Sequence, residues 1–280
     1  MLLKAPAKVN LYLEVVRKRP DGYHDIETVF QRIKLYDDIY LEKEKDGITV
    51  DCDCASIRKD DNLVYKAAKL LSAESGCRTG ARIKLVKNIP VASGLGGGSS
   101  DAAYTLIGLN QIWGLGWDKN KLSEAGKMLG ADVPFFIYET GTAVGRGRGD
   151  EIEPLEGNLP GWLVLVTFPF HVSTKEVYQE LKITLTKPPH GVKLLIDLLK
   201  GNGPWKPGRA LYNSLEQITI KKYPVILEIK DRLKKAGAEG ALMSGSGPSV
   251  FGVFRDKGKA EAARRQISVG GCNVNLVETG

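Results

Sequence analysis

The sequence contains no uninterrupted apolar run of about 18 residues, the length that a membrane-spanning helix requires. The apolar run within Met1–Lys8 is too short for a secretory signal peptide. Only four cysteines occur, and the C-x-C pair of Cys52 and Cys54 has no second pair at zinc-ligand spacing. These absences argue against a membrane protein, a disulfide-bonded protein and a zinc protein, and they predict a cytoplasmic globular chain with reduced thiols.

The common phosphate-binding signatures are missing as well. The Walker form G-x-x-x-x-G-K-[ST] needs a lysine after its last glycine, and Gly98 is followed by Ser99. The dinucleotide form G-x-G-x-x-G begins at Gly94 and Gly96 but has a serine in its sixth position. No H-R-D or D-F-G segment occurs anywhere, which excludes a protein kinase.

The length of 280 residues, with 42% hydrophobic and 26% charged, allows one large or two modest domains. Lys and Arg exceed Asp and Glu by 40 to 33, a formal charge of +7 that raises the question of nucleic acid. Basic and acidic residues alternate, however, and the aromatic and basic strand signature of an RNA-binding module is absent. We therefore predict no nucleic-acid partner and no membrane, and a basic surface that suits polyanionic substrates.

Four glycines are crowded in front of a stretch that predicts a helix. Glycine reaches positive φ and lets backbone N–H groups converge on an anion, and the helix N-terminus adds partial positive charge. Ser99 and Ser100 can cap that helix or face a phosphate or its Mg²⁺. The segment predicts a site for a nucleoside triphosphate, with a flexible Gly/Ser linker as the alternative. It comprises Pro90, Val91, Ala92, Ser93, Gly94, Leu95, Gly96, Gly97, Gly98, Ser99 and Ser100.

Hydrophobic periodicity predicts strands around this loop and a different unit after it. Strict alternation over 8–15 predicts a half-buried strand, and the turn at 20–22 predicts a second strand over 26–35. Further predicted elements are a hairpin between strands 39–41 and 48–50, a helix after Asp61, a strand at 81–87 and a helix at 121–129.

A Pro/Gly cluster at 154–161 is the predicted domain boundary, which gives domains 1–156 and 157–280. Strands and helices alternate in the second domain, as is typical of a ferredoxin-like α+β unit. The predicted elements are strand 162–167, helices 174–182, 191–200, 209–221 and 225–236, strands 240–244 and 249–254, helix 258–268 and strand 273–278.

Asp132 and Lys8 are the candidates for proton transfer and charge neutralisation. Asp132 follows Gly130 and precedes Pro134, so a stiff turn would hold a carboxylate that can take a proton from a hydroxyl, or that merely caps the turn. Lys8 shares the polar face of the first strand with Asn10, and its ammonium would keep a nearby Asp132 ionised. From spacing alone, a cap and a solvent-facing lysine are the more frequent outcomes.

Several segments together resemble the motifs of the GHMP small-molecule kinases. They are Ala5–Leu11, Asp21–His24, the glycine loop, Gly130–Phe136 and Ser244–Ser249, the last similar to the third motif of the family. The resemblance implies an α+β fold with an N-terminal ribosomal-protein-S5-like domain and a C-terminal ferredoxin-like domain. It also implies that Lys8 and Asp132 are the catalytic pair.

The order and spacing of these motifs resemble GHMP kinases whose acceptor carries cytidine. The resemblance implies ATP-dependent phosphorylation of the 2-hydroxyl of 4-diphosphocytidyl-2-C-methyl-D-erythritol, in the non-mevalonate pathway to isoprenoid precursors, with Mg²⁺ accompanying ATP and no protein ligand of the metal assigned. It implies that His24 reads cytosine and that aromatic rings stack on the base. The implied substrate contacts are Asn10, Tyr23, His24 and Tyr178, and weaker implied contacts to adenine are Asn62, Leu63 and Lys87.

Other interpretations stay open at this point. Without the resemblance, His24 is a hairpin-end histidine without a task and Tyr178 a core ring. A homoserine or mevalonate-type GHMP kinase is one alternative function, and a non-catalytic nucleotide sensor or RNA-associated protein is another. We expect a monomer or a weak homodimer.

Overall fold

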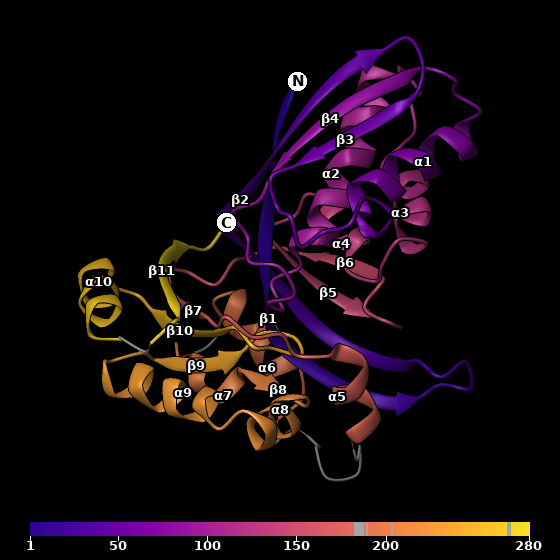
Figure 1. The fold of residues 1–280 in the computed structure, drawn as a ribbon. Helices are drawn as coiled ribbons and strands as arrows, with labels where there is room; N and C mark the ends of the chain where they lie inside the picture. The colour runs from indigo at the N-terminus through magenta and orange to yellow at the C-terminus, as the bar shows by residue number, and fades with distance from the viewer. Residues whose placement is uncertain (182–187, 189, 203, 268–269) are drawn as a thin grey trace.

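A long hairpin of β1 (Leu2–Lys18) and β2 (His24–Glu44) runs through the molecule and contributes to both of its lobes (Figure 1). The computed structural model describes residues 1–181, 188, 190–202, 204–267 and 270–280. Lys8 pairs with Arg32 and Lys18 with His24 in the antiparallel register, which shifts at three irregularities. The middle of β1 is buried almost continuously, so this strand is covered on both sides rather than half-buried as predicted.

The hairpin is the centre of a seven-stranded sheet in the order β3-β4-β2-β1-β8, with β5 beside β2 and β6 beside β5. Its other strands are β3 (Ile48–Cys52), β4 (Gly80–Val86), β5 (Thr142–Arg146), β6 (Glu151–Leu155) and β8 (Tyr212–Asn213). The predicted hairpin between 39–41 and 48–50 is wrong, because β4 lies between these segments and pairs in parallel with β3. The connection from β3 to β4 is a crossover through a helix, which parallel neighbours require.

Four helices pack on one face of this sheet, with the short 3₁₀ turn η1 (Lys59–Asp61) before the first of them. They are α1 (Leu63–Ser75), α2 (Gly97–Ile112), α3 (Lys119–Lys127) and α4 (Val133–Ile137). The side chain of Asn62 caps α1 by accepting a hydrogen bond from the N–H of Val64, and Gly76 ends the helix in the left-handed conformation. Helix α2 begins at Gly97, so the last two glycines of the predicted loop form its first turn.

A four-stranded antiparallel sheet in the order β11-β7-β10-β9 forms the second lobe. Numbered along the chain this order is 4-1-3-2, and we identify it with the predicted ferredoxin-like arrangement. Its strands are β7 (Trp162–Thr167), β9 (Gly240–Met243), β10 (Val250–Phe254) and β11 (Asn273–Glu278). Its helices are α5 (Thr174–Glu180), α6 (Lys193–Leu199), α7 (Pro207–Ala210), α8 (Glu216–Lys222), α9 (Val225–Lys235) and α10 (Lys257–Gln266). Residues 182 and 268, the predicted last residues of two helices, lie outside the described residues.

The predicted helix over 209–221 is wrong, because two short helices and strand β8 occupy this stretch. Tyr212 and Asn213 pair in parallel with Tyr12 and Leu13 of β1. The Asn213 amide donates to the carbonyls of Met243 and Gly245, both at 2.8 Å, which holds the chain extended at this point. A tertiary pairing therefore overrides the local helical preference.

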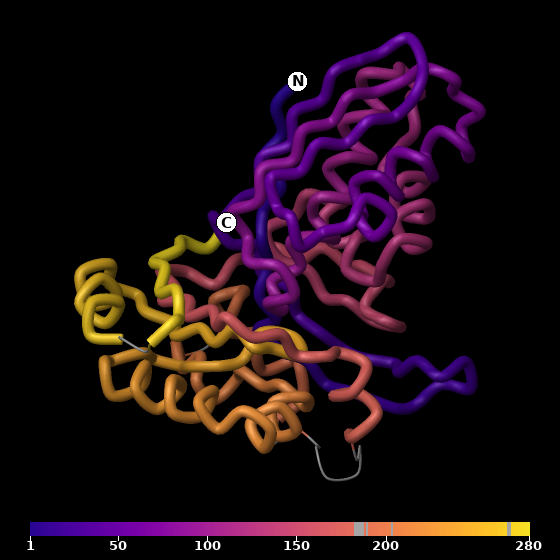
Figure 2. The backbone as a smooth tube through the Cα atoms, viewed as in Figure 1, coloured from indigo at the N-terminus to yellow at the C-terminus, as the bar shows by residue number. Residues whose placement is uncertain are grey.

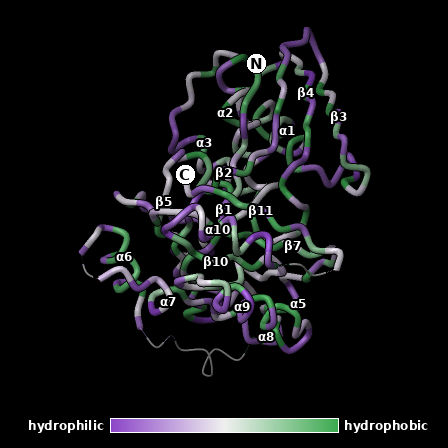
Figure 3. The backbone as a smooth tube through the Cα atoms, turned by 90° about the vertical axis from the view of Figure 1, so that its left-hand side faces the viewer, coloured by the Kyte–Doolittle hydropathy of each residue, from purple (hydrophilic) through white to green (hydrophobic). Residues whose placement is uncertain are grey.

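Both lobes share one hydrophobic cluster. Val9 and Leu11 of β1 pack in it with Leu165 of β7 and Phe251 of β10. The tube in Figure 2 shows the C-terminal segment returning beside the hairpin, where Thr279 bridges to Ile33. Figure 3 shows hydrophobic segments where the elements meet and hydrophilic turns at the upper end of β3 and β4. Among the described residues, no helix combines the length and apolar character needed to cross a membrane.

Candidate active site

The glycine loop connects β4 to α2 and bends around the N-terminus of that helix. Gly94 and Gly96 adopt positive φ, at +80° and +71°, which other residues rarely reach. Ala92 also has a positive φ of 52°, a strained conformation of a kind that collects at functional sites. The first N–H groups of a helix have no partner within it, which favours an anion at the start of α2. Binding of a triphosphate by the loop stays a prediction.

A segment of the second lobe closes over this loop. The Ser244 hydroxyl, directly after β9, donates to the carbonyl of Gly94 at 2.9 Å and accepts from the N–H of Asn10 at 3.2 Å. The N–H of Ser249 donates to the carbonyl of Ser93 at 3.3 Å. The first strand, the glycine loop and the third motif, widely separated in the sequence, therefore meet at one place.

We predict that Gly94→Ala loosens this junction. A Cβ on Gly94 would lie 2.3 Å from the carbonyl oxygen of Ser244, and the positive φ adds strain of about 1–3 kcal/mol. Gly114→Ala is the matched control, because Gly114 has a φ of +68° with no atom within 4 Å of its Cβ position. Thermal unfolding and ATP titration should show both variants destabilised but only Gly94→Ala weakened in ATP binding; equal ATP affinities would contradict the prediction.

Lys8 and Asp132 meet next to the loop. The Lys8 ammonium lies 3.2 Å from the Asp132 carboxylate and donates to the Asn10 side-chain oxygen at 2.7 Å. The Lys8 side chain is only 4% exposed, whereas that of Asp132 is 31% exposed. A Cβ on Gly96 would lie 3.0 Å from the Lys8 side chain, so this glycine leaves the space that the lysine occupies.

Asp132 stands at the N-cap position of α4, but its side chain makes no capping hydrogen bond. The helix has only five residues, and Pro134 lies in its first turn. The helix cap that the spacing favoured is therefore not formed. The Asp132 carboxylate instead contacts Lys8 and lines the cavity described below. The ammonium and the carboxylate thus lie a few ångströms apart, as their proposed partnership requires.

A cavity of about 1160 Å³ opens in front of this pair. Loop glycines, the 130–132 turn and Asn10 line one part of it, and Tyr23, His24 and residues of α5 line another. The His24 and Tyr178 rings lie 5.1 Å apart between centroids, tilted by 34°. Tyr23 is 59% exposed, and the Arg148 guanidinium lies 5.4 Å from its ring centroid. The structure thus brings all four predicted substrate contacts to one cavity, whereas stacking of a base between Tyr23 and Tyr178 stays a prediction.

The pKa values of both His24 and Tyr178 are shifted from their ordinary values. Burial and the charge of Lys18 lower the pKa of His24, so the imidazole is neutral at pH 7 and presents one donor and one acceptor nitrogen. Burial and the negative charge of Asp132 raise the pKa of Tyr178. The Asp132 carboxylate therefore lies within electrostatic reach of the Tyr178 hydroxyl.

We predict that Lys18→Met raises the pKa of His24 without restoring its ordinary value. The substitution removes the repulsion of the imidazolium by a positive charge, but burial, the larger cause, remains. Titration of the His24 ring by NMR measures this change. Lys43→Met, at an exposed position near the far end of β2, is the control, and an unchanged His24 pKa in Lys18→Met would contradict the prediction.

A buried ion-pair cluster lies behind the loop, and sequence reasoning missed two of its members. The Lys87 ammonium is bonded to the carboxylates of Asp37 and Asp101, the latter at 2.6 Å. Asp37 also accepts from the N–H groups of Asn88 and Ile89 at 2.6 and 2.8 Å, which fixes the start of the loop. Burial alone would lower the pKa of Lys87, but the charges of Asp101 and Asp37 outweigh it and raise the pKa. No local pattern marks Asp37, because its partner is 50 residues away.

The residues assigned to adenine by resemblance lie around the same helix N-terminus. A Cβ on Gly98 would be 3.4 Å from the Leu63 side chain, so the starts of α1 and α2 are neighbours. The Asn62 side-chain oxygen is used in capping α1, and the Lys87 ammonium is held by two carboxylates. Contacts of Asn62, Leu63 and Lys87 with adenine stay predictions.

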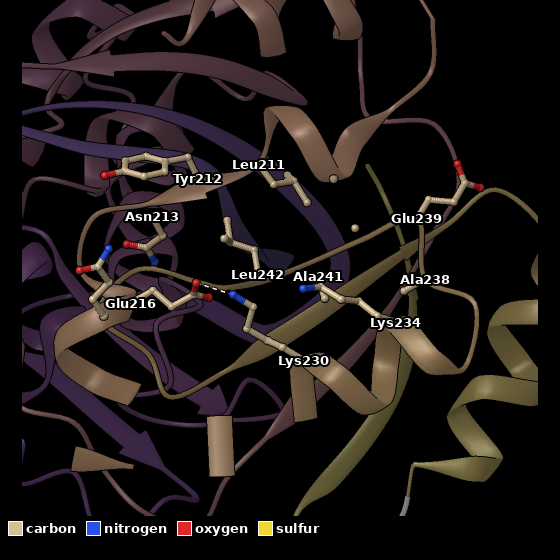
Figure 4. A pocket seen from close by; sticks show the side chains of 13 residues that line it. Leu211, Tyr212, Asn213, Glu216, Lys230, Lys234, Ala238, Glu239, Ala241 and Leu242 are labelled. Atoms are coloured by element: carbon tan, nitrogen blue, oxygen red, sulfur yellow. Dashed lines mark hydrogen bonds and ion pairs between the residues drawn. The ribbon is translucent and has the colours of Figure 1, made fainter. Parts of the chain in front are cut away.

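A second cavity of about 400 Å³ lies in the other lobe and shares no lining residue with the first (Figure 4). Glu216 pairs there with the buried Lys230, and its second oxygen accepts from the N–H of Met243 at 2.9 Å. The ion pair therefore fixes the last residue of β9, immediately before Ser244 of the third motif.

Comparison with known proteins agrees with this architecture. The family model described as the GHMP kinases N terminal domain matches residues 62–140, and the one described as GHMP kinases C terminal matches residues 195–269. A homoserine kinase from Cytophaga hutchinsonii has the same fold, with a TM-score of 0.71 at 20% identity over 99% of this chain and 96% of that chain. The fold, the glycine loop and both matches define a GHMP kinase, a class that uses ATP.

Closer relatives narrow the class. A 4-diphosphocytidyl-2-C-methyl-D-erythritol kinase from Geobacter metallireducens is 45% identical over 96% of this chain and 94% of its own length. One from Pelotomaculum thermopropionicum is 46% identical over 93% of this chain and 90% of its own length. A crystal structure of 4-(cytidine 5'-diphospho)-2C-methyl-D-erythritol kinase superposes with a TM-score of 0.83 at 35% identity, covering both chains fully. The chain belongs to the 4-diphosphocytidyl-2-C-methyl-D-erythritol kinase family.

Proposed function

We propose that this protein transfers the γ-phosphoryl group of ATP to the 2-hydroxyl of 4-diphosphocytidyl-2-C-methyl-D-erythritol, in the non-mevalonate pathway to isoprenoid precursors. The contact of Lys8 with Asp132, at 3.2 Å beside the glycine loop, is the observation that carries this proposal. The names of the relatives, at up to 46% identity, support the choice of acceptor.

Asp132 acts as the general base. Its partly exposed carboxylate faces the cavity and can accept the proton of the acceptor hydroxyl as the oxygen attacks the γ-phosphorus. To catalyse phosphoryl transfer, a protein mainly has to position the two substrates and stabilise the charge on the transferring group. Lys8, held by Asn10 as well as by Asp132, orients the carboxylate and presents its positive charge to the transferring group.

The glycine loop and the start of α2 bind the triphosphate of ATP. Mg²⁺ accompanies this ATP, and hydroxyl and carboxylate oxygens are suitable ligands for such a hard cation. Of the two serines, Ser99 is the better placed, because its Oγ lies near the 130–132 turn, 3.7 Å from where a Cβ on Gly130 would be. The Ser100 hydroxyl is fully buried and has no hydrogen-bond partner. When bound, the metal neutralises charge on the phosphates. No group of three or more His, Cys, Asp or Glu side chains in the described part of the chain forms a metal site of its own.

The aromatic end of the cavity binds cytidine. His24 reads the edge of cytosine in its neutral form, and the Tyr23 and Tyr178 rings stack on the base, each stack contributing about 1–3 kcal/mol. Homoserine and mevalonate carry no base and would leave these rings unused. The cavity therefore favours the cytidine-bearing acceptor over the acceptors of related GHMP kinases.

A panel of acceptors tests this function. The full chain, with ATP and Mg²⁺, is incubated separately with 4-diphosphocytidyl-2-C-methyl-D-erythritol, homoserine and mevalonate, and ADP formation is followed. We expect rapid turnover with the cytidyl compound alone. Turnover of homoserine but not of the cytidyl compound would overturn the substrate, and ATP binding without any turnover would overturn the enzyme.

Two further expectations accompany this function. We place the protein in the cytoplasm and expect a monomer or weak homodimer that acts on ATP and the cytidine diphosphate substrate, without nucleic acid or membrane as partner. Cell fractionation and sedimentation velocity over a range of protein concentrations measure these properties.

A further inference from the structure

The large cavity has more positive than negative groups on its walls. Five cations line it, Lys8, Lys18, Lys127, Arg148 and Lys175, against the carboxylates of Asp21 and Asp132. A cavity with this surplus favours a ligand that carries several negative charges.

Most of these cations are already neutralised. Lys8 pairs with Asp132, Lys127 with Glu124 and Arg148 with Asp150. Within the described residues, Lys18 and Lys175 have no ion pair, and both are exposed. These two lysines can therefore offer an uncompensated charge to a ligand.

Lys18 lies at the aromatic end of the cavity. It is the direct partner of His24 in the register of β1 and β2. Its charge is also felt by the His24 ring, whose pKa it helps to lower. Lys18 is thus associated with the part of the cavity that we assign to the base.

Lys175 lies between the two ends. Its neighbour Thr174 shares a hydrogen bond of 2.8 Å with Ser246 of the third motif, on the side of the glycine loop. Tyr178, three residues further along α5 and so on the same face of the helix, contacts His24. Lys175 therefore lies on α5 between Thr174, which contacts the third motif near the glycine loop, and Tyr178, which contacts His24 at the aromatic end of the cavity.

We propose that Lys175 binds the diphosphate group of the acceptor, an inference that rests on the proposed function. The acceptor carries its diphosphate between cytidine and the methylerythritol unit. With the base at His24 and Tyr178 and the hydroxyl at Asp132, the diphosphate crosses the middle of the cavity, where Lys175 is the unpaired cation. The lysine ammonium is a point charge on a flexible side chain, so it can adjust its position to contact the phosphate oxygens.

Calorimetric titration of the full chain with cytidine and with CDP tests this contact without requiring turnover. Lys175→Met is expected to bind CDP roughly 10- to 100-fold more weakly, because one charge-assisted hydrogen bond is lost, while its affinity for cytidine is unchanged. Lys175→Arg should retain most of the CDP affinity. The CDP affinity should fall less steeply with salt in Lys175→Met than in the wild type.

Lys66→Met is the control for removing an exposed helical lysine, because Lys66 lies on α1 and does not line the cavity. CDP affinity within about twofold of the wild type in Lys175→Met, or a parallel loss for cytidine, would overturn the diphosphate contact. A wild-type chain that binds cytidine and CDP equally would overturn this contact alone. A wild-type chain that binds neither would overturn the cytidine site and the proposed function with it.

Discussion

Asp132→Asn is expected to lower kcat by roughly 10²- to 10⁴-fold, because the amide keeps the shape of the side chain but cannot accept a proton. The ammonium of Lys8 keeps its contact with Asn10, so the pocket should stay assembled. ATP binding should change little, since the described contacts that hold the glycine loop, from Ser244, Ser249 and Asp37, do not involve Asp132. Steady-state kinetics with both substrates, with titration of a non-hydrolysable ATP analogue, measures the two quantities separately.

A matched control keeps this result interpretable. Asp60→Asn makes the same chemical change at an exposed residue of η1, and it should leave kcat, KM and the unfolding temperature unchanged. If Asp132→Asn retained kcat within about tenfold of the wild type, Asp132 would not be the general base. A loss of ATP affinity equal to the loss of kcat would instead identify a structural defect.

Lys87→Met is expected to lower the free energy of unfolding by about 3–5 kcal/mol, because it leaves two buried carboxylates without their cation. The side chains of Asp37, Lys87 and Asp101 are 0%, 7% and 3% exposed, so water cannot replace the ammonium. One oxygen of Asp101 already lacks a hydrogen-bond partner, which makes the remaining contact with Lys87 more important. Chemical denaturation of the purified variant measures the loss.

The pH dependence distinguishes this mechanism from a simple packing defect. Burial already raises the pKa of Asp101 in the wild type, and Lys87→Met removes the charge that opposes this rise, so the folded-state pKa of Asp101 would lie still further above its unfolded value. The deficit should therefore shrink as the pH falls through the raised pKa and one carboxyl binds a proton. Adding Asp101→Asn should restore part of the stability, whereas Lys84→Met, an exposed change on β4 three residues before Lys87, should cost little. A deficit that does not vary with pH would contradict the electrostatic explanation.

Local signals predicted most elements of the fold. The helix after Asp61, the helix at α3 and the strands β7 and β10 were predicted from neighbouring residues, and the structure has these elements. The pairing of β3 was not predictable in this way, because a short turn at Asp46 favours a hairpin and only the later arrival of β4 changes the neighbour. The predicted helix over 209–221 was wrong for the same reason, because the strand β8 within it pairs with the distant strand β1.

The residues of the candidate site likewise divide into those that local patterns predicted and those that depend on distant partners. The glycine loop and the polar face of β1 were visible as patterns, and the likeness to GHMP motifs singled out Lys8 and Asp132 from many similar residues. The cluster of Asp37, Lys87 and Asp101 was not predicted, because a buried lysine and an exposed one look alike in sequence. Lys175 was also missed, since its significance depends on which other cations of the cavity already have partners.

The hydrogen bonds between Ser244 of the third motif and both Asn10 and Gly94 join segments that are synthesised at different times. On the ribosome, Lys8, the glycine loop and Asp132 are made more than a hundred residues before Ser244. At about 5–20 residues per second, this delay lasts roughly 5 to 20 seconds. Throughout that interval the nascent chain contains the loop and both members of the ion pair but not Ser244, which joins the loop at Gly94 to the first strand at Asn10. A chain released early would therefore contain Lys8, Asp132 and the glycine loop without the hydrogen bonds that Ser244 makes with Asn10 and Gly94.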